Sequence, residues 1–284
     1  MITIAFWNIN NNTDLGDILV DFVIENDVDI LLLAECEKSN KRKTTVDDIL
    51  LDFISKSKVK LASVYNIIPN EDFRVKVISR LSPTVFQLKH NLFKSSRWSA
   101  FFINIPGIIQ LNLFPVHFYS KVNWSENSLA LECVNFSRDI AVVEQNTKCF
   151  NSILIGDFNM NPFEHGMVAS NGIHALQDLE YLAIEKDGRE IDGTIYKYFY
   201  NPMWNFLGDE SVPFGTIYHR TSGYVSHEWN IYDQVILRPE LKRHITKKST
   251  KIITTIARQP ILKKYNRPDK KYSDHLPIIL NLTI

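Results

Sequence analysis

The sequence predicts an α/β protein in which helices cover mixed sheets. Strand-like and helix-like patterns alternate in the first sixty residues, and short strand candidates dominate the later part of the chain. With 284 residues, 45% of them hydrophobic and 12% aromatic, the chain can bury a large core. These observations together favour a layered protein with mixed sheets.

The N-terminal region predicts a strand, a helix, a strand and a second helix. Residues 2–9 and 29–34 are nearly continuous apolar runs of strand length. Apolar side chains recur at helical spacing over 14–26 and over 44–56, which predicts one helix after each strand. The chain therefore begins as an alternating α/β unit.

The middle of the chain predicts several strands and one long helix. The strand candidates are rich in β-branched and aromatic residues and lie at 59–65, 73–79, 98–105 and 108–116. Pro106-Gly107 is typical of a tight turn, so the last two of these strands should pair as a hairpin. Residues 123–150 predict a long helix, and 152–155 predict a short core strand.

The last third of the chain predicts further short strands, at 216–218, 232–237, 252–256 and 276–282. Residues 162–208 show no clear periodic pattern. No Pro/Gly/Ser-rich linker, repeat or low-complexity tract divides the sequence. We therefore expect residues 1–284 to form a single domain.

The N-terminal residues, the apolar runs and the cysteines indicate in which cellular compartment the protein functions. Met1 is followed directly by an apolar stretch without a basic region, which predicts a strand and not a signal peptide. No run approaches the ~18 apolar residues of a spanning helix. Three cysteines without CxxC spacing, Cys36, Cys133 and Cys149, favour neither a disulfide framework nor a zinc site. We expect a soluble, cytoplasmic monomer.

The net charge is zero, but the charged residues are unevenly distributed. From Arg238 to Lys271 there are 12 Lys and Arg against two acids, which leaves 20 basic and 30 acidic residues elsewhere. This basic segment runs into Asp274 and His275, where it could receive a polyanion and make its binding salt-dependent. A solvated charged face is the alternative interpretation.

Polar residues follow four of the apolar strands, and they are Asn8, Glu35, His117 and Asp157. Ligands of α/β layers usually bind at strand ends, so these side chains are candidate site residues. The pentapeptide 273–277 adds an acid and a histidine just before the last strand. Because neighbouring residues of an extended chain point to opposite faces, these two should serve different partners.

These polar residues belong to six short motifs spread along the chain. The motifs are FWNIN at 6–10, LLLAE at 31–35, PVHFYS at 115–120, IGDFNMNP at 155–162, WNIYDQVIL at 229–237 and YSDHLPI at 272–278. In this order they resemble the endonuclease/exonuclease/phosphatase superfamily, which includes DNase I, abasic-site endonucleases and inositol-polyphosphate 5-phosphatases. The resemblance implies a DNase I-like four-layer sandwich, with two mixed β-sheets packed face to face and helices outside.

The resemblance also implies a metal-dependent phosphoester hydrolase. Phosphodiester hydrolysis near neutral pH needs a cation on the phosphoryl oxygens, an oriented water and help for the leaving oxygen. Mg²⁺ prefers oxygen ligands and keeps several waters, so one or two carboxylates and an amide suffice. The implied Mg²⁺ ligands are Asn8, Glu35 and Asp274, and Mn²⁺ should be able to replace Mg²⁺.

Five further side chains receive roles from the resemblance. Asp157 would orient or deprotonate the attacking water, and Asn159, two residues on along an extended segment, would hold the phosphate or that water. His275 would hydrogen-bond the scissile phosphate as an imidazolium, with Asp233 fixing its orientation. His117 resembles a second phosphate-side histidine that is present in the DNase I branch.

Each of these residues also has a structural interpretation. Asn8 and Glu35 could cap strand ends, and Gly156-Asp157 could be an ordinary turn. Asp233 and His275 could be a structural ion pair. Their joint occurrence in family order favours the catalytic interpretation.

Four residues are candidate substrate contacts. Arg97 begins a predicted strand where the family often carries a polar or basic residue that reaches a backbone phosphate, and a surface arginine is the alternative. Aromatic side chains can stack on a base or sugar, and the candidates are Tyr119, Trp204 and Trp229. Packing in the core or at its rim is the alternative for all three.

The leading hypothesis is a Mg²⁺-dependent nuclease that cuts DNA or RNA by metal-assisted in-line water attack. The sequence lacks the motifs of dinucleotide, P-loop, zincin and serine-hydrolase sites. It also lacks the Trp and the Cys-Asp-Arg of inositol-phosphate 5-phosphatases in its fourth and fifth motifs, which disfavours that branch. The alternative is a phosphatase or phosphodiesterase acting on a small or lipid phosphoester. A lesser alternative is a catalytically silent binding module on the same fold.

Overall fold

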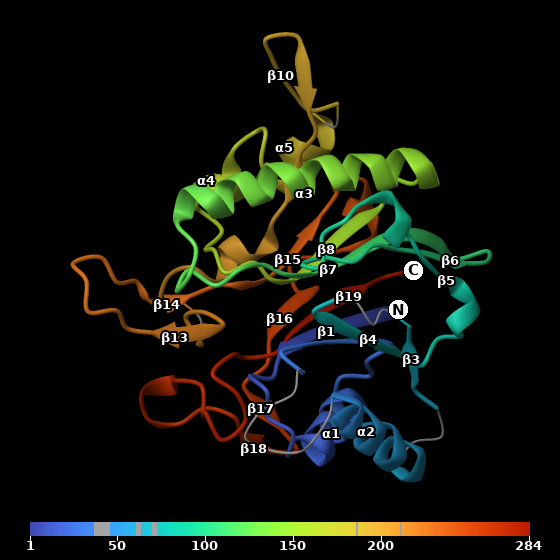
Figure 1. The fold of residues 1–284 in the computed structure, drawn as a ribbon, viewed down its shortest axis with the longest axis vertical. Coiled ribbons are helices and arrows are strands. Elements are labelled where there is room, and N and C mark those ends of the chain that lie inside the picture. The colour runs from blue at the N-terminus through green and yellow to red at the C-terminus, as the bar shows by residue number, and fades with distance from the viewer. Residues whose placement is uncertain (37–45, 61–63, 70–72, 186, 211) are drawn as a thin grey trace.

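The computed structural model describes residues 1–36, 46–60, 64–69, 73–185, 187–210 and 212–284. Two large sheets pack face to face in the middle of the molecule, and helices cover both outer faces (Figure 1). This is the four-layer arrangement expected from the sequence. Within the described residues, no helix is both long and apolar enough to cross a bilayer.

The first sheet has six strands in the order β16-β19-β1-β2-β4-β3. β1 and β2 are parallel, and the other pairs are antiparallel. β1 lies beside β19, with Ile2 opposite Leu282, so both ends of the chain meet in this sheet (Figure 1). The strand bounds are β1 Ile2–Asn8, β2 Ile30–Ala34, β3 Asn66–Ile68, β4 Val75–Ser79, β16 Thr250–Ile252 and β19 Ile278–Leu282.

The second sheet has seven strands in the order β5-β6-β7-β8-β15-β12-β9. The central strand β8 is parallel to its neighbour β7 on one side and antiparallel to β15 on the other. Both sheets are therefore mixed. The strand bounds are β5 Phe86–Leu88, β6 Phe101–Ile105, β7 Ile109–His117, β8 Ser152–Asp157, β9 Ala175–Leu176, β12 Phe199–Tyr200 and β15 Asp233–Leu237.

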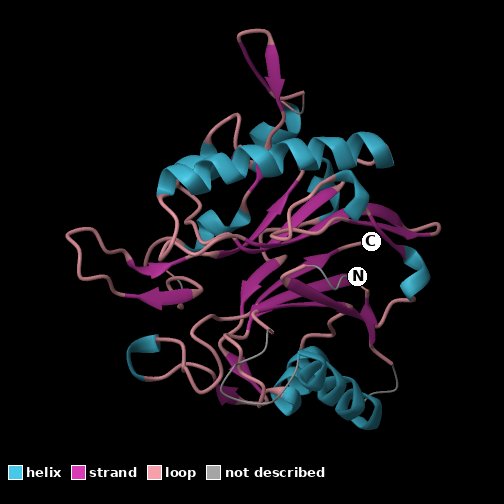
Figure 2. Cartoon of the chain, viewed as in Figure 1, coloured by secondary structure: helices cyan, strands magenta, loops and turns pink. Residues whose placement is uncertain are grey.

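Helices form the two outer layers (Figure 2). α1 (Gly16–Glu25) and α2 (Val46–Lys60) cover the first sheet, and the long α3 (Glu126–Thr147) covers the second. α3 begins after Ser125, whose side-chain oxygen accepts a backbone N–H of the first turn, and ends at Lys148 in the left-handed conformation. Smaller elements lie at the edges: α4 His165–Val168, α5 Leu179–Ile184, the hairpins β10 Arg189–Ile191 with β11 Thr194–Tyr196, β13 Ile217–His219 with β14 Glu228–Asn230, and β17 Thr255–Ile256 with β18 Gln259–Pro260, and the 3-10 helices η1 Pro83–Val85, η2 His90–Leu92, η3 Pro202–Phe206, η4 Pro239–His244 and η5 Lys264–Asn266.

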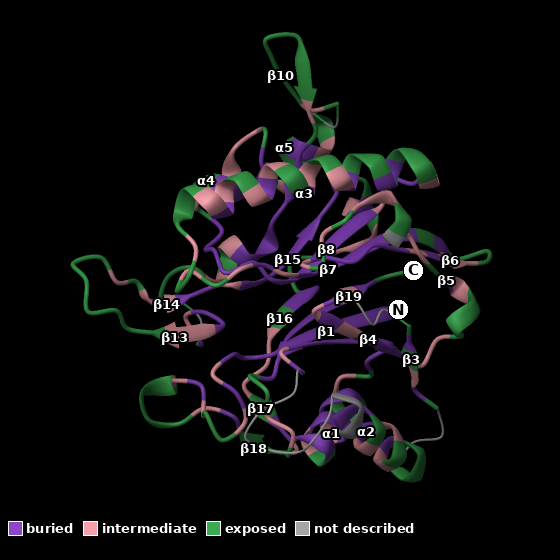
Figure 3. Ribbon diagram, viewed as in Figure 1, coloured by how far each residue is buried: buried purple, intermediate pink, exposed green. Residues whose placement is uncertain are grey.

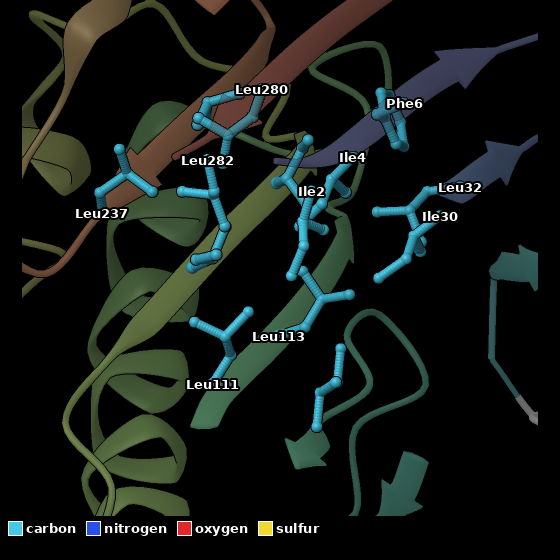
Figure 4. Packing of buried hydrophobic residues seen from close by; sticks show 14 of the residues in the cluster. Ile2, Ile4, Phe6, Ile30, Leu32, Leu111, Leu113, Leu237, Leu280 and Leu282 are labelled. Carbon is cyan, nitrogen blue, oxygen red and sulfur yellow. The ribbon is translucent and has the colours of Figure 1, made fainter. Parts of the chain in front are cut away.

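The core between the sheets comes from the alternation of side chains along each strand. In β1, Ile4 and Phe6 point between the sheets, whereas Ala5 and Trp7 pack toward α1 and α2. Figure 3 shows the buried residues running along the sheets, with the exposed ones on the outer helices and loops. Figure 4 shows the inner layer, in which these side chains meet: Ile2, Ile4, Phe6, Ile30, Leu32, Leu280 and Leu282 from the first sheet with Leu111, Leu113 and Leu237 from the second.

Most predicted elements are confirmed with small shifts at their ends. The hairpin expected at Pro106-Gly107 is present, since β6 and β7 pair as antiparallel strands and Gly107 has φ 74°. The predicted strand at 252–256 is divided, because β16 ends at Ile252 and β17 begins at Thr255. Short strands such as β14 were not expected from the sequence, because two or three residues carry too little periodicity.

The strand predicted at 59–65 is wrong. Residues 61–63 lie outside the described residues, but α2 continues through Lys60, and the strand that pairs with β4 is β3 at 66–68. Ion pairs with α1 hold the last turns of α2, with Lys56 Nζ 2.9 Å from Asp17 and Lys60 Nζ 3.2 Å from Asp21. The main stabilisation of α2 is the burial of its apolar face, with Ile49, Leu50 and Phe53 packed in the core beneath α1 and α2.

A buried ion pair joins α3 to the second sheet. Glu144 is 2% and Arg238 5% exposed, and Arg238 Nε lies 2.8 Å from Glu144 Oε1. Further hydrogen bonds satisfy both groups, from Arg238 Nη1 to the Tyr198 carbonyl and from Ser152 Oγ to Glu144 Oε1. Arg238 is therefore a structural residue, although it opens the basic segment of the sequence.

We expect Arg238→Met to lower the free energy of unfolding by about 3–5 kcal/mol, because it leaves Glu144 buried without its cation. Lys242→Met is the matched control, since Lys242 pairs with Glu180 at the surface and its loss should cost less than about 1 kcal/mol. Urea denaturation followed by circular dichroism measures both changes. Equal, small losses would contradict a buried pair.

Candidate active site

The polar side chains at the strand ends lie on the same face of each strand as the apolar side chains that fill the core between the sheets. In β8, Ile153 and Ile155 face the opposite sheet, so Asp157, two residues further, faces it too. The same two-residue step orients three more side chains, Asn8 in β1, His117 in β7 and Asp233 in β15. A polar cluster therefore forms where the apolar core ends.

Three neighbouring strands of the second sheet place His117, Asp157 and Asp233 side by side. His117 lies opposite Asp157 in the parallel pair β7–β8, and Asp157 lies opposite Asp233 in the antiparallel pair β8–β15. Gly156 permits this close approach, because a Cβ there would lie 1.9 Å from the Val116 carbonyl oxygen. Gly156 and Asp157 belong to β8, so their interpretation as an ordinary turn is wrong.

Asn8 connects the two sheets at this edge. It is fully buried at the end of β1, and its Nδ2 lies 3.1 Å from Glu35 Oε1 and 3.1 Å from Asp157 Oδ2. An amide nitrogen carries two hydrogens, so both contacts are satisfied hydrogen bonds. One side chain of the first sheet thus holds a carboxylate from each sheet.

His275 completes the cluster from the loop before β19. Its Nδ1 lies 2.8 Å from Asp233 Oδ2, and its Nε2 lies 4.0 Å from Asp157 Oδ2. Its backbone is fixed as well, because Trp7 Nε1 donates to its carbonyl and its N–H donates to Ser273 Oγ. Trp7 and Ser273 lie within the sequence motifs, but only the structure reveals these positioning contacts.

Burial and charge shift the pKa values of the cluster. Burial alone lowers the pKa of His275, but the charge and hydrogen bond of Asp233, with Asp157 and Asp274, outweigh it and raise that pKa to about 10. Burial is the main cause that raises the pKa of the Asp157 carboxyl. Burial also lowers the pKa of His117. At neutral pH the site therefore contains one imidazolium and one neutral imidazole.

His117 lies at the rim of the cluster. Its Nε2 is 3.6 Å from Glu35 Oε1 and 4.0 Å from Asp157 Oδ2, and its side chain is 13% exposed. Its Nδ1 is buried and has no partner among the described residues. A buried ring nitrogen without a partner is uncommon in native proteins and marks a place where a ligand can supply the missing hydrogen bond.

Asn159 lies in the cluster, but the extended segment expected there is absent. Its φ is 52°, its N–H donates to Asp157 Oδ1 at 2.8 Å, and its Nδ2 donates to the Phe118 carbonyl at 3.1 Å. The Asp157 side chain thus bends the following chain back on itself. Glu35 also has a left-handed backbone, with φ 51°.

Asp274 faces a different space from His275, as the sequence predicts for neighbouring residues. It is half-buried and lines a separate pocket with Arg220, Lys263 and Arg267. The hydrogen bonds described for Asn8 join it to Glu35, Asp157 and Asn10, not to Asp274.

Arg97 and Tyr119 belong to a stacked column beside the cluster. The guanidinium carbon of Arg97 lies 3.6 Å from the Tyr119 ring centroid, and the Trp124 ring lies 3.7 Å away on Tyr119, 7° from parallel. Because two groups cannot share one ring face at this distance, Arg97 and Trp124 cover opposite faces. Stacking of a base on Tyr119 would require one of them to move. The column also contacts the cluster, since the Arg97 carbonyl accepts the His117 N–H at 2.8 Å.

The two predicted tryptophan contacts lie in other surroundings. Trp229 meets Phe214 and Tyr218 edge to face, with ring centroids 6.1 and 5.6 Å away. Trp204 is half-buried in η3, and its Nε1 is buried without a partner among the described residues. Trp124 was not identified from the sequence, because no motif or strand end marks it.

Two sets of side chains fit a divalent metal ion. Asp157, Asp233 and His275 each offer a ligand atom, and these atoms lie within 4.8 Å of one another. Because His275 Nδ1 already binds Asp233, only its Nε2 is open to a metal. Glu35 and Asn8 form the second set, whose oxygen donors suit a hard cation such as Mg²⁺, although Asn8 turns its Nδ2 to Glu35 and its Oδ1 accepts the Asn10 N–H.

The comparisons with known proteins identify structural relatives. No family model and no curated protein sequence matches this chain. An endonuclease/exonuclease/phosphatase family protein from Leptotrichia buccalis C-1013-b aligns over 100% of both chains, with 15% identity and a TM-score of 0.56. An AP endonuclease from Archaeoglobus fulgidus also aligns over 100% of both, with 16% identity and a TM-score of 0.56. Truncated Caenorhabditis elegans TDP2 aligns over 100% of this chain and 98% of its own, with 13% identity and a TM-score of 0.53. The predicted fold class is thereby confirmed.

We expect His275 to be an imidazolium and His117 a neutral imidazole at pH 7.5 in the metal-free protein, as ¹⁵N chemical shifts of the rings would show. The folded pKa of His275, about 10, lies above its ordinary value of 6.5. Its ion pair therefore stabilises the fold fully below about pH 6.5, and this stabilisation is lost as the pH rises through about 10. Asp233→Asn should remove that pH dependence. A neutral His275 at pH 7.5 would contradict the described pairing.

Proposed function

We propose that this chain, which has the DNase I-like fold of the endonuclease/exonuclease/phosphatase superfamily, is a divalent-metal-dependent phosphodiester hydrolase acting on DNA or RNA. The observation that carries the proposal is the hydrogen-bonded cluster that joins the two sheets, with the members Asn8, Glu35, Asp157, Asp233 and His275. Phosphoester hydrolysis needs a bound cation, a base for the attacking water and a hydrogen-bond donor to the phosphate, and these side chains are of the types that supply them.

Asp157 is the group we assign to the attacking water. Asn8 Nδ2 donates to its Oδ2 and the Asn159 N–H to its Oδ1, so its carboxylate is held in one orientation. Burial raises the pKa of Asp157, which improves its ability to accept a proton near neutral pH. Such a carboxylate can orient a water and take its proton as the water attacks phosphorus. Asn159 is assigned to the phosphate or the water.

The two histidines are assigned to the phosphate. His275 is held as an imidazolium through Nδ1 by Asp233, which leaves Nε2 to donate to a phosphoryl oxygen and to balance its charge. His117 is neutral and lies beside Glu35, where it can donate one hydrogen bond. A charged and a neutral imidazole can thus bind different oxygens of the same phosphate.

Glu35, assisted by Asn8, is assigned to a divalent cation, Mg²⁺ or Mn²⁺, whereas Asp274, which the sequence also predicts as a ligand, lines the neighbouring pocket. Such a cation supplies charge neutralisation to the phosphoryl and leaving oxygens. Glu35 is half-buried at the edge of the cluster, and one of its oxygens is fixed by Asn8. Asn8 therefore links the assigned metal side to the assigned water side through a single amide.

Of the four predicted substrate contacts, Arg97 and Tyr119 lie beside this cluster, and Trp204 and Trp229 lie in other surroundings. Arg97 is supported by its buried Nε, which has no partner among the described residues and could bind a backbone phosphate. Tyr119, Trp204 and Trp229 are assigned to bases or sugars on their aromatic character alone. The AP endonuclease among the similar structures acts on nucleic acid by its name, which favours the same substrate class here.

The two alternatives differ from this proposal in what they require. A phosphatase or phosphodiesterase for small or lipid phosphoesters would use the same cluster with other surroundings, whereas a silent binding module needs no such cluster. Incubating the protein with Mg²⁺ or Mn²⁺ and labelled single- and double-stranded DNA, RNA and a panel of small phosphoesters separates all three. Hydrolysis of none of them would refute the proposed activity.

We expect Asp157→Asn to lower hydrolysis by about 10²–10⁴-fold, because an amide cannot accept the proton of the water. His275→Ala should have an effect of similar size while the fold remains intact, which circular dichroism checks. His244→Ala is the matched control, since His244 lies in η4 and binds the Thr283 carbonyl. Full turnover by His275→Ala would show that the assigned mechanism is wrong.

We expect chelation with EDTA to abolish hydrolysis and Mg²⁺ or Mn²⁺ to restore it. Glu35→Gln should raise the metal concentration needed for half-maximal activity by about 10–100-fold, the range seen when a metal site loses a partner. Glu240→Gln in η4 is the control for the loss of one acid. Restoration by Zn²⁺ but not by Mg²⁺ would instead favour the Asp157, Asp233 and His275 set.

A further inference from the structure

A cavity opens next to the catalytic cluster. It has a volume of about 340 Å³ and lies between the β13–β14 hairpin and the loop that carries η5. Figure 1 shows both segments at the edge of the molecule opposite the chain ends. Four cations line the cavity, Arg220, Lys263, Arg267 and Lys270, with one carboxylate, that of Asp274. We call it the basic pocket.

The basic pocket is built from the same chain segments as the catalytic cluster. Asp274 lines the pocket, and the next residue is His275 of the cluster. Ile217 pairs with His275 in a β-bridge, and the next residue, Tyr218, lines the pocket. Consecutive Cα atoms are about 3.8 Å apart, so residues of the basic pocket and of the catalytic cluster are adjacent along the chain in both segments.

The cations of this pocket are largely unneutralised. Among the described residues, no carboxylate forms an ion pair with Lys263, Arg267 or Lys270. Arg220 forms one ion pair, in which its Nε lies 3.5 Å from Glu228 Oε1, and the Arg220 side chain is 75% exposed. Four cations around one cavity repel one another and create a positive potential there. Asp274 balances one of these charges, so an anion of two or more charges fits the remainder.

Arg267 is held in place before any ligand arrives. Its guanidinium carbon lies 3.9 Å from the Tyr218 ring centroid, and the Tyr218 hydroxyl donates to Glu228 Oε2 at 2.6 Å. Stacking on the ring leaves the N–H groups of the guanidinium free at its edge. A planar fork of this kind suits bidentate binding of a phosphate.

The rest of the basic segment lies elsewhere. Arg238 is buried against Glu144, and Lys242 pairs with Glu180 at the surface. Three exposed lysines, Lys247, Lys248 and Lys251, do not line the basic pocket. Of the twelve basic residues in this run, Lys263, Arg267 and Lys270 therefore line the basic pocket, whereas Arg238 and Lys242 pair with acids elsewhere.

We propose that the basic pocket binds phosphates of the nucleic acid chain that neighbour the scissile one, an inference that rests on the proposed function. The pocket adds two or three backbone contacts beyond the reacting phosphate, which position the strand without reading its sequence. A substrate with a single phosphate cannot use it. The pocket therefore favours polynucleotides over small phosphoesters.

The test compares two triple variants that remove the same total charge. One is Lys263→Gln, Arg267→Gln and Lys270→Gln, in the pocket, and the control is Lys247→Gln, Lys248→Gln and Lys251→Gln, outside it. The probe is a labelled 12-nucleotide single-stranded DNA, cleaved with Mg²⁺ at several salt concentrations. We expect the pocket variant to raise KM at least tenfold at 0.15 M salt and to flatten the salt slope of binding by about two, at roughly 0.7 per lost single-strand contact. The control should match the wild type.

Other measurements keep the two proposals separate. Wild-type protein is also assayed on bis(p-nitrophenyl) phosphate, which has no neighbouring phosphate. Failure of the wild type to hydrolyse any of the nucleic acids and small phosphoesters of the panel would refute the proposed function. Cleavage of the oligonucleotide with equal KM and salt slope in both triple variants would refute the basic pocket alone.

Single variants keep the test valid if the triple variant does not fold. Lys263→Gln and Lys270→Gln change exposed side chains, and each should flatten the slope by about 0.7. Arg267→Lys keeps the charge but not the fork, so its KM should lie between those of the wild type and Arg267→Gln. An Arg267→Lys variant as weak as Arg267→Gln would show that charge in the pocket does not bind the chain.

Discussion

The hydrogen bond from Asn8 to Asp157 is the contact on which the site depends, because it joins the two sheets through polar atoms. Behind it, the inner faces of the described strands are filled with apolar side chains. The bond requires Asn8 and Asp157 to end their strands on the same inward face and at the same level. Because the same amide nitrogen also donates to Glu35, any shift between the sheets would change the distance between Glu35 and Asp157. The rigidity of the sandwich is therefore part of the chemistry.

Two buried carboxylates and a buried imidazolium at one point cost desolvation free energy. Pairing His275 with Asp233 offsets part of that cost, and Asn8 and the Asn159 N–H offset part for Asp157. The charged groups of the cluster are thus paired with one another or hydrogen-bonded by neighbouring amides, and they do not depend on solvent for their partners. A site of this kind is tuned for reactivity, since the same burial that destabilises the charges displaces their pKa values.

Much of the fold and of the site could be predicted from the sequence. Strand and helix periodicity yields β1, α1, β2 and α3, and polar residues after apolar runs reveal Asn8 and Asp157. Periodicity is a local property, however, and the strand predicted at 59–65 is replaced by a longer α2, whose apolar face is buried through Ile49, Leu50 and Phe53. The positions of Trp124 and Asp274 depend on how loops fold over the sheet edge, and no repeat of two or 3.6 residues reports that. Equally, a run of basic residues does not reveal that Arg238 is buried and Arg267 lies beside the site.

The pairing of β1 with β19 also governs when the site comes into existence. Along the chain Asn8 precedes and His275 follows all other members of the cluster, yet β1 and β19 are direct neighbours. Contacts of such sequence separation form slowly, because a long loop must close before they stabilise anything. During synthesis a partial chain therefore carries the carboxylates but not the imidazolium opposite them. The polar cluster therefore becomes complete only when β19 pairs with β1.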